Sequence, residues 1–322
     1  TQEQLYLFRS REHFQRLRQS AKIMRMQLNY SDDQLVEIAH ELALKNGYTE
    51  DIYMRPMVYK SSEAVGVRMH DLEDDFLLFV TPFGAYLDTE IGARCMTSSW
   101  RRIDDTMIPV RAKVNGLYVN NAMAKTEAQL NGFDEAIMLN VDGHVSEGSG
   151  ENIVMVKDNT LISPPPQDNI LEGITLETIL SVTQKDLNLP IVRRSIDRSE
   201  LYIAEEVLMT GTAAHVTPVT EVDRVPVGSG KPGPISKKLQ DSLGERYYVN
   251  YSMRYKNPSI SSVLEEFRQK NLEQIIIIPL YPQHASSSTT SSMEAVMDAL
   301  KKWWVIPEIS IVSQFYKEGF YL

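Results

Sequence analysis

MIPVRAKVNGLYVNN, at residues 107–121, and GHVSEGSGEN, at residues 143–152, are the two stretches that decide how this chain is interpreted. Lys113 stands among mostly neutral residues, and Tyr118 follows it five positions later. Glu147 comes 34 positions after the lysine, in a turn rich in glycine and serine. Such an amine can bond covalently to a carbonyl group, the phenol can donate to a ring oxygen, and the carboxylate can hold a proton on a ring nitrogen.

Residue chemistry alone leaves alternatives for each of these side chains. Most lysines are solvated at the surface, and Glu147 could be an ordinary solvated turn residue. Glu151, four positions later, is a second candidate for the carboxylate. Lys125, in the segment AKTE, is predicted to lie at an exposed position of a helix.

Both stretches closely resemble the branched-chain amino acid aminotransferases, a family of fold-type IV pyridoxal phosphate enzymes, and the resemblance covers about residues 5–240. It implies a two-domain fold of the α+β / α/β class. It also implies pyridoxal 5′-phosphate as cofactor, with Lys113 as the Schiff-base lysine, Tyr118 beside the ring oxygen and Glu147 beside the pyridine nitrogen. Members of the family have a further N-terminal segment, so the small domain is expected to be truncated.

Two glycine-containing turns are candidates for the phosphate group. The motif LEGIT leads into a predicted helix, so the amides of Ile174 and Thr175 and the Thr175 hydroxyl could face an anion. The motif TGTAA follows a predicted strand and offers further amides and Thr212. Arg16 matches the phosphate-binding arginine of the family; without the resemblance it would be read as a surface helix residue.

The resemblance also implies a substrate site for leucine, isoleucine and valine and for acidic 2-oxo acids. Arg55 and the adjacent Tyr53 match residues that recognise the side-chain carboxylate of glutamate or 2-oxoglutarate, for which a guanidinium fork is suited. Phe83 and Tyr86 match apolar pocket positions, and Ala213 is a further substrate-site position. Because active sites in this family are completed across a dimer, a homodimer or higher homo-oligomer is expected.

The C-terminal part has a different character. MRYKNPS, IIIIPLYPQH and SSSTTSS, beginning at Met253, Ile275 and Ser286, closely resemble the N-terminal half of ferrochelatase over about residues 245–322. The half of that enzyme with its catalytic histidine and glutamate is absent, so chelatase activity is not expected. The alternative function is porphyrin binding or a structural role for this segment. A natural fusion, an engineered chimera and a wrongly assembled sequence would each give this pattern.

The predicted organisation is therefore a small domain at residues 1–86, a large cofactor-binding domain at residues 87–240 and a ferrochelatase-like α/β segment, with a βαβ arrangement, at residues 241–322. Hydrophobic patterning predicts strands at 5–8, 52–59, 76–81, 135–139, 153–156, 191–194, 207–210, 275–279 and 309–312, and a further strand starting near Cys95. It predicts helices at 14–26, 35–44, 120–131, 175–185, 261–270 and 293–302, a helical turn at 199–204 and a helix starting near Ile235. A capping box at residues 31–34 precedes the helix at 35–44, and Asn46-Gly47 ends it.

Composition and local sequence argue against several other classes of protein. The 322 residues have a net charge of −10, which argues against a non-specific nucleic-acid binder. Cys95 is the single cysteine, as expected for a cytoplasmic protein, and no activating feature surrounds it. The apolar run from Ile275 to Leu280 is too short to span a membrane, and no signal peptide is expected from the first residues, which are charged and lack an apolar core. His284 has no companion ligands, so no metal site is expected.

Overall fold

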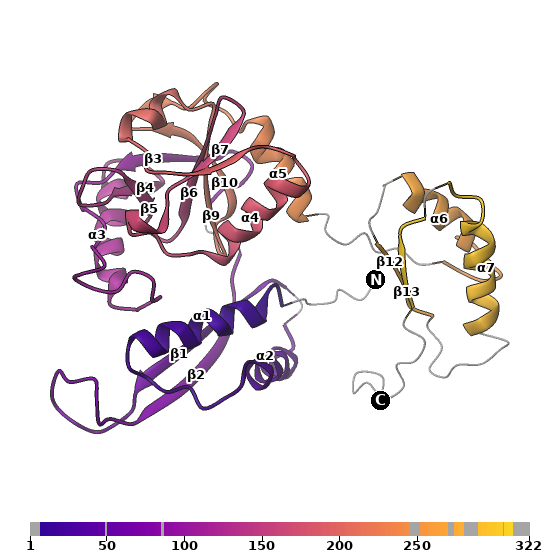
Figure 1. Cartoon of the computed structure of the whole chain (residues 1–322), viewed down its shortest axis with the longest axis horizontal. Helices are drawn as coiled ribbons and strands as arrows, with labels where there is room; N and C mark the ends of the chain where they lie inside the picture. The colour runs from indigo at the N-terminus through magenta and orange to yellow at the C-terminus, as the bar shows by residue number, and fades with distance from the viewer. Residues whose placement is uncertain are drawn as a thin grey trace. The chain divides into compact units, whose positions relative to one another are not determined.

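The computed structural model describes residues 7–48, 50–84, 87–244, 252–269, 274–279, 289–304 and 306–311. The chain divides into two compact units, Thr1–Glu245 and Arg246–Leu322. Figure 1 shows the elements of both units. Each unit has its own hydrophobic core, and each is described here by itself.

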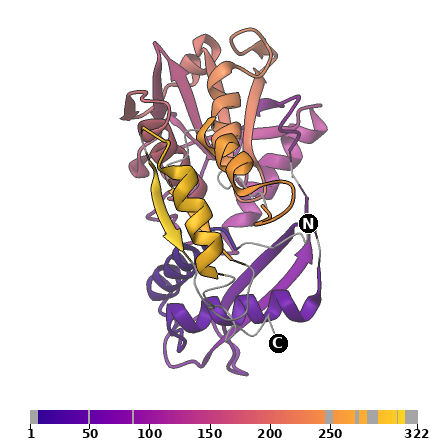
Figure 2. The same ribbon diagram turned by 90° about the vertical axis from the view of Figure 1, so that its right-hand side faces the viewer.

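The first unit begins with two helices that pack on a two-stranded antiparallel sheet (Figures 1 and 2). These elements are α1 (Ser10–Ile23), α2 (Asp32–Asn46), β1 (Ile52–Lys60) and β2 (Asp74–Pro82). The predicted capping box is present, since Ser31 Oγ accepts a hydrogen bond from the Gln34 amide at 3.2 Å. Gly47 ends α2 with a φ of 64°, the left-handed conformation that glycine adopts without steric cost.

The predicted strand at residues 5–8 is wrong where the structure describes it. Leu7 and Phe8 form a coil and a turn that lead into α1, and residues 5 and 6 lie outside the described ranges. Leu7 packs instead against the cluster that contains Phe14 and Leu35. A short apolar run can serve a helix-packing contact as well as a strand, and its periodicity cannot distinguish the two.

Residues 87–244 are built around a nine-stranded mixed sheet. Its strands are β3 (Ala93–Thr97), β4 (Glu135–Leu139), β5 (Val145–Gly148), β6 (Asn152–Lys157), β7 (Thr160–Ser163), β8 (Ile191–Arg193), β9 (Glu206–Gly211), β10 (His215–Val222) and β11 (Val225–Pro226). The path β10-β3-β4-β5-β6 returns to β10 because β9 pairs with both β6 and β10. The sheet therefore closes into a barrel, whose core includes Cys95, Ile137, Met155 and Met209.

Three helices cover the outside of this sheet: α3 (Leu117–Leu130), α4 (Ile174–Lys185) and α5 (Pro234–Gly244). Ala124 and Ala128 of α3 pack on Ala136 and Met138 of β4. Helices α4 and α5 share a second cluster with β6, β9 and β10, in which Ile179 and Leu239 are fully buried. Two short 3₁₀ helices, Pro166–Asp168 and Arg198–Ile203, complete the described connections.

Two local expectations need correction. Glu147 lies in strand β5 and not in a turn, because the turn itself begins after Gly148. Lys125 is not an exposed helix residue. Its Nζ lies 2.6 Å from Glu135 Oε2, and the Lys125 side chain is 14 % exposed. A polar residue with a buried partner cannot be distinguished from a solvated one by patterning.

The second unit contains the predicted βαβ arrangement, preceded by a helix. Its elements are α6 (Ile260–Gln269), β12 (Gln274–Ile277), α7 (Ser291–Leu300) and β13 (Glu308–Ile311). The two strands are parallel, and Ile275 packs with Leu264 and Val296 in the core of the unit. His284 and residues 286–288 lie outside the described ranges.

Candidate active site

Lys113 lies in the connection that precedes α3, next to helix α1. Its backbone N–H donates to Ser20 Oγ of α1 at 3.1 Å. Its Nζ lies 5.4 Å from the centroid of the Tyr118 ring, and Tyr118 is on the first turn of α3. Both side chains are exposed. The structure therefore brings together the predicted amine and phenol.

Glu147 is buried and surrounded by donors. Its Oε1 is paired with Arg102 Nη2 at 2.7 Å. Its Oε2 accepts from the Leu171 amide at 2.8 Å and from Asn152 Nδ2 at 3.1 Å. Burial raises the pKa of the Glu147 carboxyl, while Arg102, the Leu171 amide and Lys113 act in the opposite direction. The carboxylate is thus fixed in one orientation, in the electric field of the candidate lysine.

Glu151, the alternative carboxylate, has a different environment. Its Oε2 accepts from the Gly150 amide at 3.0 Å, and burial, followed by the nearby Glu135 carboxylate, raises its pKa. The positive charge of Lys113 lowers the pKa of Glu147, whereas burial and Glu135 are the largest influences on the pKa of Glu151. The ion pair with Arg102 and the two donors on its other oxygen favour Glu147 over Glu151 as the candidate carboxylate.

The start of α4 lies beside this carboxylate. Gly173 is the N-cap residue, and a glycine has no side chain that could cap the first amides of the helix. Arg16 Nη1 lies 3.4 Å from the neighbouring Glu172 carbonyl oxygen. Ile174 and Thr175 begin the helix, so their amides and the helix dipole favour an anion at this end.

The turn after β9 contains two further predicted site residues. Thr212 and Ala213 lie in this turn; Thr212 is exposed and Ala213 is half-buried. In the sheet register, Glu147 is opposite Asn152, and Asn152 is opposite Thr210, so the three residues share one face. Thr210 Oγ1 is buried and has no hydrogen-bond partner among the described residues.

The predicted substrate residues lie on β1 and just after β2. The rings of Tyr53 and Phe83 are 5.5 Å apart, and the Arg55 guanidinium lies 5.2 Å from the centroid of the Tyr53 ring. Arg16 interacts electrostatically with the phenols of both Tyr53 and Tyr118. It therefore connects the predicted substrate residues with the predicted cofactor residues. Tyr86 lies outside the described residues.

Sequence reasoning missed two residues of this region, Arg102 and His13. The adjacent pair Arg101-Arg102 gives no signal of which arginine turns inward. Burial, with Arg16 and Lys113 acting in the same direction, lowers the pKa of His13 to about 4. His13 is therefore uncharged near neutral pH, because it is partly buried and lies among cationic side chains.

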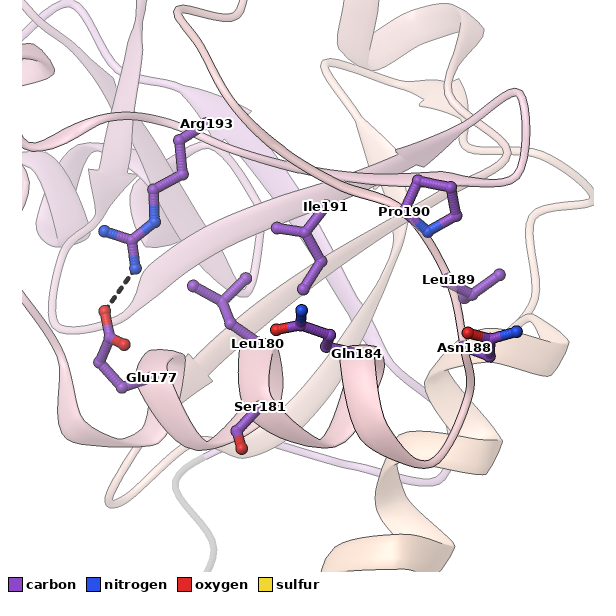
Figure 3. Close-up of a pocket in the computed structure, with 9 residues that line it drawn as sticks. All are labelled: Glu177, Leu180, Ser181, Gln184, Asn188, Leu189, Pro190, Ile191 and Arg193. Atoms are coloured by element: carbon purple, nitrogen blue, oxygen red, sulfur yellow. Dashed lines mark hydrogen bonds and ion pairs between the residues drawn. The ribbon is translucent and has the colours of Figure 1, made fainter.

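A separate groove of about 690 Å³ lies along α4 and β8 (Figure 3). Its lining includes Leu180, Gln184 and Pro190, and the ion pair between Glu177 and Arg193 lies at one end. It contains none of the predicted site residues. In the described part of the chain, no group of three or more His, Cys, Asp or Glu side chains could hold a metal. None of the described helices is both long enough and apolar enough to cross a membrane.

A closed mixed sheet, with a lysine amine beside a tyrosine ring and a buried, arginine-paired carboxylate near a helix N-terminus, is the arrangement expected of a class IV aminotransferase. The chain belongs to this family, since the model described as amino-transferase class IV matches residues 3–222. A model described as ferrochelatase matches residues 234–322.

The relatives narrow the group within this family. The chain is 48 % identical over 240 residues to a probable branched-chain-amino-acid aminotransferase of Aquifex aeolicus, covering 74 % of this chain and 77 % of the relative. The branched-chain aminotransferase of Thermoproteus uzoniensis with norvaline has a TM-score of 0.72 at 43 % identity, over 75 % of this chain and 80 % of that one. The T.th. branched-chain amino acid aminotransferase complexed with N-(5′-phosphopyridoxyl)-L-glutamate has a TM-score of 0.69 at 38 % identity, over 74 % and 78 %.

These findings confirm the expected fold-type IV architecture, the assignment as an aminotransferase of the branched-chain group and the ferrochelatase-like character of the C-terminal segment.

Proposed function

We propose that this chain binds pyridoxal 5′-phosphate through Lys113 and transfers the amino group of leucine, isoleucine or valine to 2-oxoglutarate, which yields glutamate and a branched-chain 2-oxo acid. The observation that carries the proposal is the environment of the buried Glu147 carboxylate. Arg102, the Leu171 amide and Asn152 hold it in place, and the positive charge of Lys113 acts to lower its pKa. The relatives described with norvaline and with phosphopyridoxyl-L-glutamate support both substrate classes.

The residues present fit the cofactor. Thr210 Oγ1 is a buried hydroxyl without a hydrogen-bond partner in the part of the chain that the structure describes, on the face that carries Glu147. The amides of Ile174 and Thr175, with Arg16 and Thr212, would hold the phosphate group. Lys113 would be the covalent ligand, Tyr118 would donate to the ring oxygen, and Glu147 would hold a proton on the ring nitrogen.

When bound, pyridoxal phosphate supplies an electron sink for the pair left by the substrate Cα–H bond. The amine of Lys113 would accept the proton from the substrate Cα and donate it again later in the transfer. Glu147 would hold a proton on the ring nitrogen, which would maintain the capacity of the ring to accept electrons. His13, uncharged near neutral pH, adds no further positive charge beside Arg16.

Substrate selection is assigned to the residues on β1 and around Phe83. Arg55 would bind the second carboxylate of glutamate or 2-oxoglutarate with its planar fork. Tyr53 would assist Arg55 in this recognition, and Phe83, Tyr86 and Ala213 would contact the aliphatic side chains of the branched-chain substrates. We further infer a homodimer or higher homo-oligomer located in the cytoplasm.

The C-terminal unit has a second candidate function, because the ferrochelatase model matches residues 234–322. In this interpretation the functional domains are residues 1–86, 87–240 and 241–322, and the last of them binds a porphyrin or has a structural role. Titration of the full chain with a free porphyrin, followed by its visible absorption, tests this. Absence of a spectral change at micromolar protein would eliminate porphyrin binding.

The experiment that tests the main proposal is reduction with borohydride after incubation with pyridoxal phosphate. Peptide mass spectrometry should find a phosphopyridoxyl group on Lys113, and the unreduced protein should convert leucine and 2-oxoglutarate to glutamate. Lys113→Ala should lose both properties, while Lys22→Ala, a change at an exposed position of α1, should keep them. A phosphopyridoxyl group on another lysine in Lys113→Ala, with activity retained, would overturn the assignment.

A further inference from the structure

Arg102 is a buried arginine whose side chain makes three separate polar contacts. The side chain is 3 % exposed, and its backbone N–H is fixed by the Leu139 carbonyl at 2.8 Å. Nε donates to the Asn169 carbonyl at 3.2 Å, Nη1 donates to Asn121 Oδ1 at 2.8 Å, and Nη2 is paired with Glu147 Oε1 at 2.7 Å. All three guanidinium nitrogens are therefore used in directions fixed by the planar fork.

These contacts connect the two parts of the site. Asn121 is on α3, one helical turn after Tyr118, so Arg102 is anchored to the helix that carries the phenol. Asn169 lies two residues before Leu171, whose amide donates to the other oxygen of Glu147. The guanidinium thus sets the position of Glu147 relative to Tyr118 through contacts of 3.2 Å or less.

The charge of Arg102 has a second consequence. Glu147 is 5 % exposed, and burial favours the neutral acid, which raises the pKa of this carboxyl. Arg102 is the largest opposing influence. A neutral acid beside a ring nitrogen would leave its proton on the carboxyl, whereas an ionised carboxylate stabilises the proton on the nitrogen.

We propose that Arg102 is a positioning residue for the cofactor ring: it holds Glu147 ionised and in one orientation, and thereby sets the protonation of the ring nitrogen. This inference rests on the proposed function, since it requires that pyridoxal phosphate be bound. It predicts that Arg102 acts on the ring nitrogen and not on the phosphate or the covalent bond.

The test uses the full-length protein loaded with pyridoxal phosphate labelled with ¹⁵N in the ring. In the wild type and in Arg101→Gln, the ¹⁵N chemical shift should be that of a protonated ring. Arg101 is the matched control because it is the adjacent arginine and its side chain is exposed. Arg102→Gln should move the shift toward the unprotonated value, and Arg102→Lys, which keeps the charge, should restore part of it.

A second measurement compares affinities for pyridoxal phosphate and for its 1-deaza analogue, which has a C–H group in place of the ring nitrogen. Arg102→Gln should reduce the preference for pyridoxal phosphate by about tenfold or more, the scale of one charged hydrogen bond. A structural defect alone would lower the affinity for both ligands by the same factor. If Arg102→Gln does not fold, Asn121→Ser, which removes one anchor of the guanidinium, should lower the pH at which the ring nitrogen is protonated.

An unchanged ¹⁵N shift and an unchanged preference in folded Arg102→Gln, or an unchanged titration in Asn121→Ser, would refute the role of Arg102. Failure of the wild type to bind pyridoxal phosphate would instead refute the proposed function. The two failures are therefore distinguishable.

Discussion

Gly173 and Asn152 approach so closely that a Cβ atom on Gly173 would lie 2.0 Å from Asn152 Oδ1. Asn152 cannot retreat freely, because its Nδ2 donates both to Glu147 Oε2 at 3.1 Å and to the Leu171 carbonyl at 2.8 Å. The start of α4 and the carboxylate of Glu147 are therefore held together through one amide side chain. This contact couples the candidate phosphate site to the candidate ring-nitrogen site.

Gly173→Ala should accordingly weaken pyridoxal phosphate binding by about tenfold or more, because the methyl group displaces Asn152 and removes a hydrogen bond to a charged group. Gly150→Ala is the control, since a Cβ there would meet no atom within 4 Å. Equilibrium binding of the cofactor, followed by fluorescence, measures both variants. Equal affinity in the two would show that Asn152 can shift without consequence.

Glu147→Gln should retain the cofactor but slow the half-reaction with leucine by about a hundredfold, the scale on which loss of one stabilising group slows an enzyme. A neutral amide keeps the shape of the side chain but cannot hold a proton on the ring nitrogen. Single-turnover kinetics with leucine give the rate. A near-normal rate in Glu147→Gln, together with a slow Glu151→Gln, would transfer the role to Glu151.

Arg55→Ala should impair the reactions of glutamate and 2-oxoglutarate far more than that of leucine, because only the acidic substrates have a second carboxylate. The expected loss in kcat/KM for glutamate is roughly tenfold to a hundredfold, as for one charged hydrogen-bonded partner. Arg68→Ala, in the exposed connection between β1 and β2, is the control. Equal losses for leucine and glutamate would assign Arg55 a structural role.

Glu151 should make the stability of the fold depend on pH. Burial and then the nearby Glu135 raise the pKa of Glu151 to about 8, above its usual value of 4.5. Between these values the folded state keeps a proton that the unfolded chain has lost, so the free energy of unfolding falls as the pH rises through this window. Glu151→Gln should flatten that fall. Urea unfolding at about pH 5 and at about pH 8 gives the free energy of unfolding of both proteins. An equal decrease between the two pH values in the wild type and in Glu151→Gln would contradict the prediction.

Local patterning predicted the regular parts of the fold well. The capping box at Ser31, the helix that ends at Gly47 and strand β4 at Glu135–Leu139 are where the sequence places them. These elements obey periodicities of 3.6 or 2 residues that any amphipathic segment shows. Strands β5, β7, β10 and β11 were missed. Strand β5 shows why: Val145–Gly148 is short and half polar, and its polar residues are nevertheless buried.

The candidate site was predicted less completely, for a physical reason. Lys113, Tyr118 and Glu147 are recognisable by the motifs in which they occur, and the structure places Lys113 beside Tyr118. Arg102 has no such motif, and its importance comes from contacts with residues 19, 45 and 67 positions away in the chain. Contacts of this range depend on how the barrel closes, and no local pattern encodes that closure.

Removal of the second unit, with the chain ending at Glu245, should leave the aminotransferase site intact. Every described residue assigned to that site precedes Thr220, but the first unit extends to Glu245 and includes α5, in which Leu239 is fully buried against β9 and α4. Deletion of residues 246–322 should therefore preserve phosphopyridoxyl labelling of Lys113 and the thermal stability of the first unit. Deletion of residues 234–322 also removes Leu239 and should cost several kcal/mol, because it leaves a large apolar surface of α4 uncovered. Loss of the Lys113 label in a folded chain lacking only residues 246–322 would show that the C-terminal unit is an integral part of the enzyme.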